Sequence, residues 1–337
     1  MTPALSEVEQ LSFKIVAFGE ILWDLLPEGR TLGGAPFNFA YRVNSLGDTA
    51  YPVSRLGRDP LGREAWDLVT AFGIDPSCLQ WDDSYPTGTV RVSFDADNNP
   101  DFVIVPSVAY DFIESTPQLE HIVTSADCLC FGTLIQRSDV SRNSLHRLLQ
   151  NAASSRKLLD VNLRKDCFTP ETVRQSIEAA DIVKLNEKEA VAVGEMLGLP
   201  VLALSQLALE MARRCRLEAV VVTLGEKGVL AASPQGEQPV YVPGFRVPVV
   251  DSLGSGDSFS AGFVHRLLHG ATLGEACVFG NLMGAVSATK RGATAPISRD
   301  EITELGRQSG GERIVQPELA KFWDGEDFQG AKERRVE

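Results

Sequence analysis

Short, nearly apolar segments alternate with longer segments of helical pattern over most of this chain of 337 residues. The apolar segments are residues 14–22, 50–56, 128–134, 157–163, 181–186 and 218–225. Strands that are apolar on both sides are covered on both faces, so these segments predict a buried, mainly parallel sheet. Helical patterns lie between them, including residues 35–47, 61–73, 141–153 and 204–215. Right-handed crossovers would place these helices on both faces, which predicts a three-layer α/β/α sandwich.

Residues 89–105 interrupt the alternation with two strand-like runs around a polar turn. In the first run Val90, Val92 and Phe94 alternate with polar residues, so one face of this strand meets water or a ligand. A hairpin inserted into a parallel α/β domain predicts a flap or lid, and an edge hairpin without a function is the alternative.

The composition narrows the class of partner. A net charge of −13 argues against binding nucleic acid or an anionic membrane through bulk charge. A phosphorylated ligand remains compatible, because local backbone dipoles and a metal can hold it. The first 14 residues lack an apolar core, and no apolar run is long enough to span a bilayer. We therefore expect a cytoplasmic protein.

Cysteine and histidine residues give weak signals for a metal site. Cys128 and Cys130 alternate with apolar residues in a strand-like run, which predicts buried thiols rather than ligands or a disulfide. His265 and His269 have helical spacing that could ligate a metal. No cysteine or acidic third ligand is evident near them in the sequence, so we expect no metal there.

The sequence DSLGSGD at residues 251–257 lies between a strand-like and a helix-like segment. Gly254 and Gly256 permit backbone geometries that a β-carbon would block. A loop that enters a helix directs unpaired N–H groups and the positive end of the helix dipole at one point, which favours phosphate. Asp257 would compete with that anion unless it serves as a base beside the phosphate.

Two other glycine-rich segments strengthen this interpretation. TLGEKG, at residues 223–228, suits the phosphates of a nucleotide, although a hairpin turn is the alternative. LGGAPFNFA, at residues 32–40, places two glycines before a helix that begins at about Pro36, and a plain helix entry is the alternative.

Together these segments resemble the PfkB-type, ribokinase-like carbohydrate kinases. The family's first signature corresponds to Gly33, Gly34, Asn38, Ala40, Gly47 and Gly57, and its second to residues 251–257. Between them, DVNLR at residues 160–164 matches D-x-N-x-R, and Asn186 with Glu189 matches N-x-x-E. The likeness runs from about residue 14 to about residue 300, with the fructokinase branch as the nearest group.

The resemblance implies a ribokinase-like kinase domain at residues 14–305. A β lid would come from about residues 20–33 and 88–106, and a homodimer would form through the lids of two subunits. Residues 306–337 would form a polar C-terminal extension.

The resemblance also implies roles for individual residues in ATP-dependent phosphoryl transfer to a sugar. Asp257 would be the base, and the amides of Gly254, Ser255 and Gly256 the anion hole. The remaining expected residues are Arg164 at the phosphates or the sugar, Asn186 and Glu189 at hydrated Mg²⁺, Thr223, Gly225, Gly228 and Asn281 at ATP, and Asp251 with residues 290–298 at a monovalent cation such as K⁺. A structural salt bridge is the alternative for Arg164.

The sugar site would come from Asp24, Gly33, Gly34 and Asn38. The side chains of Asp24 and Asn38 can accept and donate hydrogen bonds to neighbouring hydroxyl groups, which suits a neutral polyol. The segment FVIVPSVAYDFI, at residues 102–113, lacks the Tyr and Arg that 2-keto-3-deoxygluconate kinases direct at a carboxylate. Fructose is therefore the expected acceptor, at its 6-hydroxyl, with 2-keto-3-deoxygluconate or ribose as alternatives. A catalytically inactive sugar-binding regulator on the same fold is a further alternative. A dinucleotide-binding oxidoreductase is disfavoured, because no G-x-G-x-x-G opens the first strand–helix unit.

Overall fold

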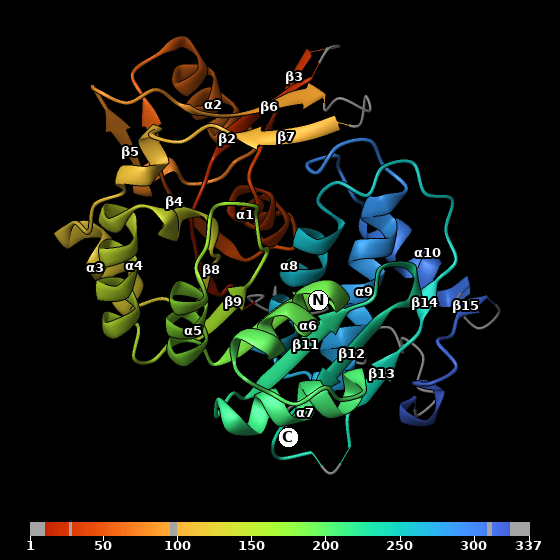
Figure 1. The fold of residues 1–337 in the computed structure, drawn as a ribbon. Coiled ribbons are helices and arrows are strands. Elements are labelled where there is room, and N and C mark those ends of the chain that lie inside the picture. The colour runs from red at the N-terminus through yellow and green to blue at the C-terminus, as the bar shows by residue number, and fades with distance from the viewer. Residues whose placement is uncertain (1–10, 27–28, 95–99, 237, 309–311, 324–337) are drawn as a thin grey trace, which may run out of the picture.

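The computed structural model describes residues 11–26, 29–94, 100–236, 238–308 and 312–323 (Figure 1). Its centre, within these residues, is a nine-stranded sheet in the order β13-β12-β11-β10-β9-β8-β1-β4-β5. The strands are β1 Lys14–Phe18, β4 Thr49–Gly57, β5 Leu79–Asp82, β8 Cys128–Phe131, β9 Arg156–Asp160, β10 Ile182–Asn186, β11 Ala219–Thr223, β12 Val229–Ala232 and β13 Val240–Val242. From β5 to β11 the neighbours pair in parallel, and β12 and β13 pair antiparallel. The predicted mainly parallel sheet is confirmed.

Successive residues of each central strand contact different layers of helices. In β1, Ile15 and Ala17 join one core, whereas Val16 and Phe18 join the other. The first core includes residues of α1 Ala35–Ser45, α8 Ser255–Leu268 and α9 Leu273–Ala288. The second includes residues of α3 Pro117–Thr124, α4 Asp139–Asn151, α5 Pro170–Ala179, α6 Glu187–Met196 and α7 Leu204–Arg214. Burial on both faces explains why these strands are apolar throughout.

A second sheet of four strands lies beside the end of β4, over α1 and α2 Pro60–Ala71 (Figure 1). Its order is β3-β2-β6-β7, with β2 Leu22–Leu26, β3 Gly29–Gly33, β6 Gly88–Phe94 and β7 Pro100–Ile104. The expected single strand over residues 14–22 is wrong, because β1 ends at Phe18 and β2 belongs to this other sheet. A β-carbon on Gly19, between the two, would lie 2.5 Å from Cγ of Pro36. The polar turn of the predicted hairpin, residues 95–99, lies outside the described residues.

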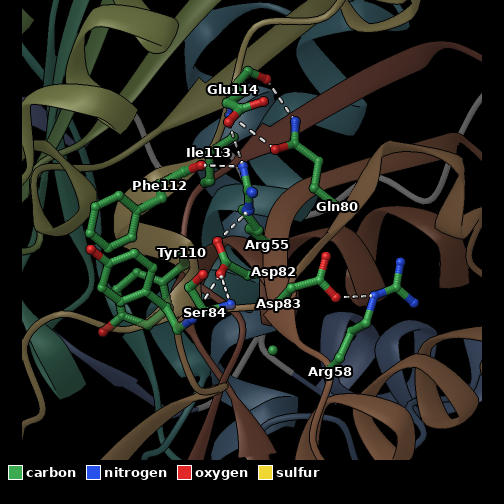
Figure 2. A network of polar contacts seen from close by, with 12 residues as sticks. Arg55, Arg58, Gln80, Asp82, Asp83, Ser84, Tyr110, Phe112, Ile113 and Glu114 are labelled. Carbon is green, nitrogen blue, oxygen red and sulfur yellow. Dashed lines mark hydrogen bonds and ion pairs between the residues drawn. The ribbon is translucent and has the colours of Figure 1, made fainter.

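An ionic network fixes the passage from the large sheet to the small one (Figure 2). Arg55 at the end of β4 pairs with buried Asp82 at 2.8 Å and with Glu114 at 3.0 Å. Arg55 also donates a hydrogen bond to the carbonyl of Phe112, in η2 Ala109–Phe112. The other oxygen of Asp82 accepts hydrogen bonds from the backbone of Ser84 and Tyr85. The segment that enters β6 and the segment that follows β7 are therefore tied to one arginine.

The segment after α10 Arg299–Gln308 packs against the rest of the chain where the structure describes it. The strand β15 Arg313–Ile314 pairs antiparallel with β14 Gly244–Phe245. The hydroxyl of Tyr241 accepts a hydrogen bond from the backbone of Gln316 and donates one to the carbonyl of Lys227, both at 2.7 Å. Leu319, which precedes η5 Ala320–Phe322, is buried in the core.

Cys128 and Cys130 are buried and carry free thiols, as predicted. Within the described part of the chain, no helix combines the length and the apolar character that a bilayer crossing needs.

Candidate active site

Several polar side chains gather where the parallel strands end. The strand order changes direction at β1, which lies between β4 on one side and β8 on the other. Ligands of open α/β sheets bind at such a switch point, beyond the carboxyl ends of the strands. A small cavity of about 20 Å³ lies there, lined among others by Glu20 after β1, Thr133 after β8, and Asp160 and Asn162 at the end of β9.

Asp257 lies in the first turn of α8, opposite α1. Gly254 caps this helix with a left-handed backbone, at φ 74°, and a β-carbon there would lie 2.4 Å from Cβ of Ala293. Only glycine fits this turn without strain. Asn38 of α1 donates a hydrogen bond of 2.8 Å from Nδ2 to Oδ2 of Asp257. The first signature motif and the second, 219 residues apart, therefore meet in a direct contact.

Burial, together with the nearby carboxylate of Asp160, raises the pKa of Asp257 to about 6. Lys184, Asn38 and Arg164 act in the opposite direction. A carboxyl group with a pKa near neutrality can accept a proton from an alcohol and release it again.

A buried ion pair lies beneath the DSLGSGD turn. Lys184 of β10 contacts Asp160 at 2.9 Å, and Ser260 of α8 donates a hydrogen bond to the same carboxylate. Burial favours the neutral amine, but the charge of Asp160 outweighs it and raises the pKa of Lys184. A β-carbon on Gly256 would lie 3.2 Å from Nζ of Lys184. A positive charge is thus adjacent to the turn.

Sequence reasoning missed Lys184, and it also missed Glu20. Glu20 is buried, and its carboxylate accepts a hydrogen bond from the backbone of Ala35. Burial raises the pKa of Glu20 to about 7, while Arg164 opposes and Asp257 adds to this effect. The available signal was a single charged residue in or directly after an otherwise apolar strand, at positions 20 and 184.

The residues predicted for the sugar lie around these carboxyl groups. Asp24 of β2 lies against Gly33 of β3, where a β-carbon would come within 2.7 Å of Oδ2 of Asp24. Gly34 caps α1, and a β-carbon there would lie 2.3 Å from the carbonyl oxygen of Glu20. Arg164 is exposed, and its charge lowers the pKa of Glu20, Asp24 and Asp257. Burial nevertheless raises the pKa of Asp24. One arginine therefore faces three carboxyl groups.

Asn186 and Glu189 form a capping box at the start of α6. Oδ1 of Asn186 accepts from the backbone of Glu189, and Oε2 of Glu189 accepts from the backbone of Asn186. Oε1 of Glu189 accepts from the backbone of Leu163, which lies in the loop after β9. Each carboxylate oxygen keeps a further lone pair, so the pair suits an ion held through water rather than directly.

The residues predicted for the nucleotide lie at two places. Thr223 ends β11, and Gly225 and Gly228, both at positive φ, form the turn into the antiparallel strand β12. A β-carbon on Gly228 would lie 2.0 Å from the carbonyl oxygen of Val242. Asn281 of α9 is buried and donates a hydrogen bond to the carbonyl of Pro243. Residues 223–228 thus form a hairpin turn, which was the alternative to a phosphate-binding loop. Asn281 holds the neighbouring segment at Pro243.

Asp251 precedes the DSLGSGD turn and links it to the loop at residues 290–298. Its Oδ1 accepts from the backbone of Leu253, and its Oδ2 accepts from the backbone of Gly292 at 3.0 Å. This carboxylate therefore ties the two loops together through backbone N–H groups.

His265 and His269 do have an acidic neighbour, contrary to expectation. Asp48 lies with them, and the ligand atoms of the three are within 4.8 Å of one another. Nδ1 of His265 bonds Asp48 at 2.7 Å, and the two ring nitrogens of His269 bond the carbonyls of His265 and Leu11. Three of the four ring nitrogens are engaged within the protein, which makes this cluster a polar anchor for the helix end.

Comparison with protein families decides the class of this site. The family description "pfkB family carbohydrate kinase" matches residues 28–300. The chain belongs to the PfkB family of carbohydrate kinases. It is therefore a phosphotransferase that uses an alcohol group as acceptor, as the motifs implied.

Relatives of this PfkB kinase act on different sugars. An uncharacterised sugar kinase of Pyrococcus horikoshii is 30% identical over 86% of this chain and 94% of the relative. A 2-dehydro-3-deoxygalactonokinase of Haloferax volcanii is 29% identical over 88% of this chain and 98% of its own. A fructokinase of Salmonella typhimurium is 28% identical over 86% of this chain and 98% of its own.

Solved structures confirm the ribokinase-like fold of the kinase. The Pyrococcus horikoshii protein superposes with a TM-score of 0.72 over 86% of this chain and 97% of its own. A fructokinase of Xylella fastidiosa superposes with a TM-score of 0.78 over 89% of this chain and 100% of its own, at 22% identity.

Proposed function

We propose that this PfkB kinase transfers the γ-phosphoryl group of ATP to the 6-hydroxyl of fructose, with Asp257 as general base. The observation that carries the proposal is the position of Asp257. It lies at the positive end of α8, bonded to Asn38 of the sugar-side helix, and burial raises its pKa to about 6. A base with this pKa is mostly ionised at neutral pH and matches the task of deprotonating an alcohol.

The turn before Asp257 supplies the anion hole. The amides of Gly254, Ser255 and Gly256 begin α8, where the helix dipole favours negative charge. Lys184 adds a positive charge behind Gly256. Donors that are already in place stabilise the charge that develops on the transferring phosphoryl group. Arg164 faces the carboxyl groups of this site and would contact the phosphoryl group or the sugar.

ATP would bind along the turn at Thr223, Gly225 and Gly228, with Asn281 fixing the neighbouring segment at Pro243. A solved structure of the Pyrococcus horikoshii relative, 29% identical, contains ATP. Asn186 and Glu189 would hold hydrated Mg²⁺ through water, which supplies charge neutralisation at the phosphates. Asp251 and residues 290–298 would support a monovalent cation such as K⁺.

Two arguments support fructose as the acceptor. The side chains of Asp24 and Asn38 suit a neutral polyol, and several relatives are fructokinases. Asp24, Gly33, Gly34 and Asn38 lie around the expected position of the hydroxyl groups. Oδ1 of Asn38 and Oγ of Ser255 are buried and have no hydrogen-bond partner among the residues that the structure describes. Such atoms need an explanation, and a polar ligand at this site provides one.

We assign residues 14–305 to the kinase unit, with the four-stranded sheet as its lid, and residues 306–337 to an extension. Pairing of two lids in a homodimer is the assembly that this arrangement would permit.

A panel of acceptors tests the choice of sugar. With ATP and Mg²⁺, we expect the highest kcat/KM for fructose, above ribose and above the sugar acids 2-dehydro-3-deoxygluconate and 2-dehydro-3-deoxygalactonate. Asp24→Ala should raise the KM for fructose at least tenfold and leave the KM for ATP within about twofold, because one lost hydrogen bond to a hydroxyl costs on the order of 1.5 kcal/mol. A sugar acid as the best acceptor would refute fructose, and no turnover with any sugar would favour the inactive regulator.

A further inference from the structure

Arg42, four residues after Asn38 on α1, is a fully buried arginine with an exposed fraction of 0%. Its Nε donates to Oγ of Ser258 at 3.0 Å, and its Nη2 donates to the carbonyl of Ala293 at 2.8 Å. Within the described part of the chain, its Nη1 is buried without a hydrogen-bond partner, and no carboxylate forms an ion pair with Arg42. The Cζ atom of Arg42 lies 5.1 Å from the centroid of the Tyr41 ring.

A buried charge without an opposite charge is costly, so folded proteins rarely contain one without a reason. Burial lowers the pKa of Arg42, while the charges of Tyr41 and Asp257 raise it. An arginine keeps its proton under these conditions. The guanidinium is therefore a fixed positive charge, and the carboxylate of Asp257 is one of the charges that act on it.

Both groups that Arg42 holds belong to the edges of the anion hole. Ser258 directly follows Asp257. Ala293 packs against Gly254, so closely that a β-carbon on that glycine would lie 2.4 Å from Cβ of Ala293. Asn38, one helical turn before Arg42, holds Asp257 itself. The helix α1 thus fixes the base with one side chain and the two sides of the turn with another.

The two buried cations near the turn differ in their compensation. Lys184 is paired with Asp160 at 2.9 Å, so most of its charge is neutralised within the protein. Arg42 has a hydroxyl and a carbonyl as partners. A negatively charged group bound in the turn would therefore interact more strongly with Arg42, whose partners are neutral, than with Lys184, which is already paired with a carboxylate.

We propose that Arg42 is a positioning residue for phosphoryl transfer: it closes the Gly254–Asp257 turn against Ala293 and supplies a buried positive charge whose partner is the transferring phosphoryl group. This inference rests on the proposed kinase reaction, since it requires Asp257 and the turn to act on phosphate. The alternative is a purely structural anchor between α1 and α8.

Three variants separate the two roles. Arg42→Met keeps the volume and removes both the charge and the donors, and Arg42→Lys keeps the charge. We expect Arg42→Met to lower kcat at least 30-fold, with the KM for ATP and for sugar within about threefold of wild type. Arg42→Lys should retain most of the wild-type kcat. Arg137→Met is the matched control, because the side chain of Arg137 is only 11% exposed but is paired with Asp111 at 2.8 Å. It should lower the melting temperature without the selective loss of kcat.

The pH profile gives a readout that an anchor would not move. Around Asp257 lie Asp160 of β9, Lys184 of β10, Asn38 and Arg42 of α1, and Arg164 and Glu20 of the neighbouring loops. Loss of the Arg42 charge destabilises the ionised base, so the acid limb of kcat/KM should move to higher pH in Arg42→Met and stay in place in Arg42→Lys and Arg137→Met. An unmoved limb in a folded Arg42→Met variant, or a wild-type kcat, would overturn the proposal.

A binding measurement distinguishes failure of this inference from failure of the proposed function. Fluoroaluminate with ADP and Mg²⁺ mimics the transferring phosphoryl group and needs no turnover. Wild type should bind this mixture at least tenfold tighter than ADP alone, and Arg42→Met should lose that gain while it keeps its affinity for ADP. An equal gain in both proteins, or no gain in wild type, contradicts the role of Arg42 whatever the acceptor sugar. Wild type that shows the gain and phosphorylates another sugar in preference to fructose contradicts the proposed acceptor alone.

Discussion

At the scale of single residues, the site brings together carboxyl groups whose ionised form is destabilised by burial. Burial raises the pKa of Asp257 to about 6 and that of Glu20 to about 7. Asp257 could be singled out from the sequence, because a carboxylate beside three small residues at a helix start conflicts with anion binding unless it is a base. For Glu20 and Lys184 the sequence offers only a charged residue in or after an apolar strand. Their roles, and that of Arg42, depend on burial and on partners far away in the sequence.

The pKa of Asp257 predicts the acid limb of activity. The working form of the base is the carboxylate, so kcat/KM should fall about tenfold per pH unit below pH 6 and be nearly constant from pH 7 to pH 8. Initial rates at saturating ATP and low sugar over pH 4.5–8.5 measure this profile. A limb that stays at about pH 4, the ordinary range of an aspartate, would show that the base is not held in this buried environment.

At the scale of elements, most helices and strands follow from apolar periodicity, as α1, α7 and β10 illustrate. The exception is residues 14–22, where an unbroken apolar pattern spans two sheets, because periodicity does not register a change of partner. The packing of β15 and Leu319 against the core was equally hidden. A polar segment with one or two apolar anchors gives too weak a pattern to predict its contacts.

The junction between the sheets offers a stability test at this scale (Figure 2). Arg55→Met should cost on the order of 3 kcal/mol of unfolding free energy, because it leaves the buried carboxylate of Asp82 without its counter-charge. Arg58→Met is the matched control, since its pair with Asp83 is exposed and worth less than about 1 kcal/mol. Urea unfolding measures both. Equal losses in the two variants would show that the junction does not depend on Arg55.

At the scale of the whole molecule, the topology makes one site from distant motifs. The carboxyl ends of β1, β8, β9 and β10 bring Glu20, Thr133, Asp160 and Asn186 to one edge, and α1 carries Asn38 to Asp257. The order of the motifs in the sequence indicated the family and the fold. It did not indicate which residues meet, because a contact such as Asn38 with Asp257 depends on how the helices pack. The acceptor sugar is also beyond the motifs, since relatives with the same framework differ in substrate.

The most direct test of the account is the rate of sugar phosphorylation by Asp257→Asn. Asparagine keeps the shape and the contact with Asn38 but cannot accept the proton, so kcat should fall by about three orders of magnitude or more. The variant should remain folded and be at least as stable as wild type at pH 7.5. The pKa of Asp257 is raised from about 4 in the unfolded chain to about 6 in the folded state. Wild type therefore loses stability as the pH rises from about 4 to about 6, and this loss, which persists at pH 7.5, is absent from the variant. A folded Asp257→Asn enzyme with a kcat near that of wild type would contradict the assignment of the base, and with it the proposed mechanism.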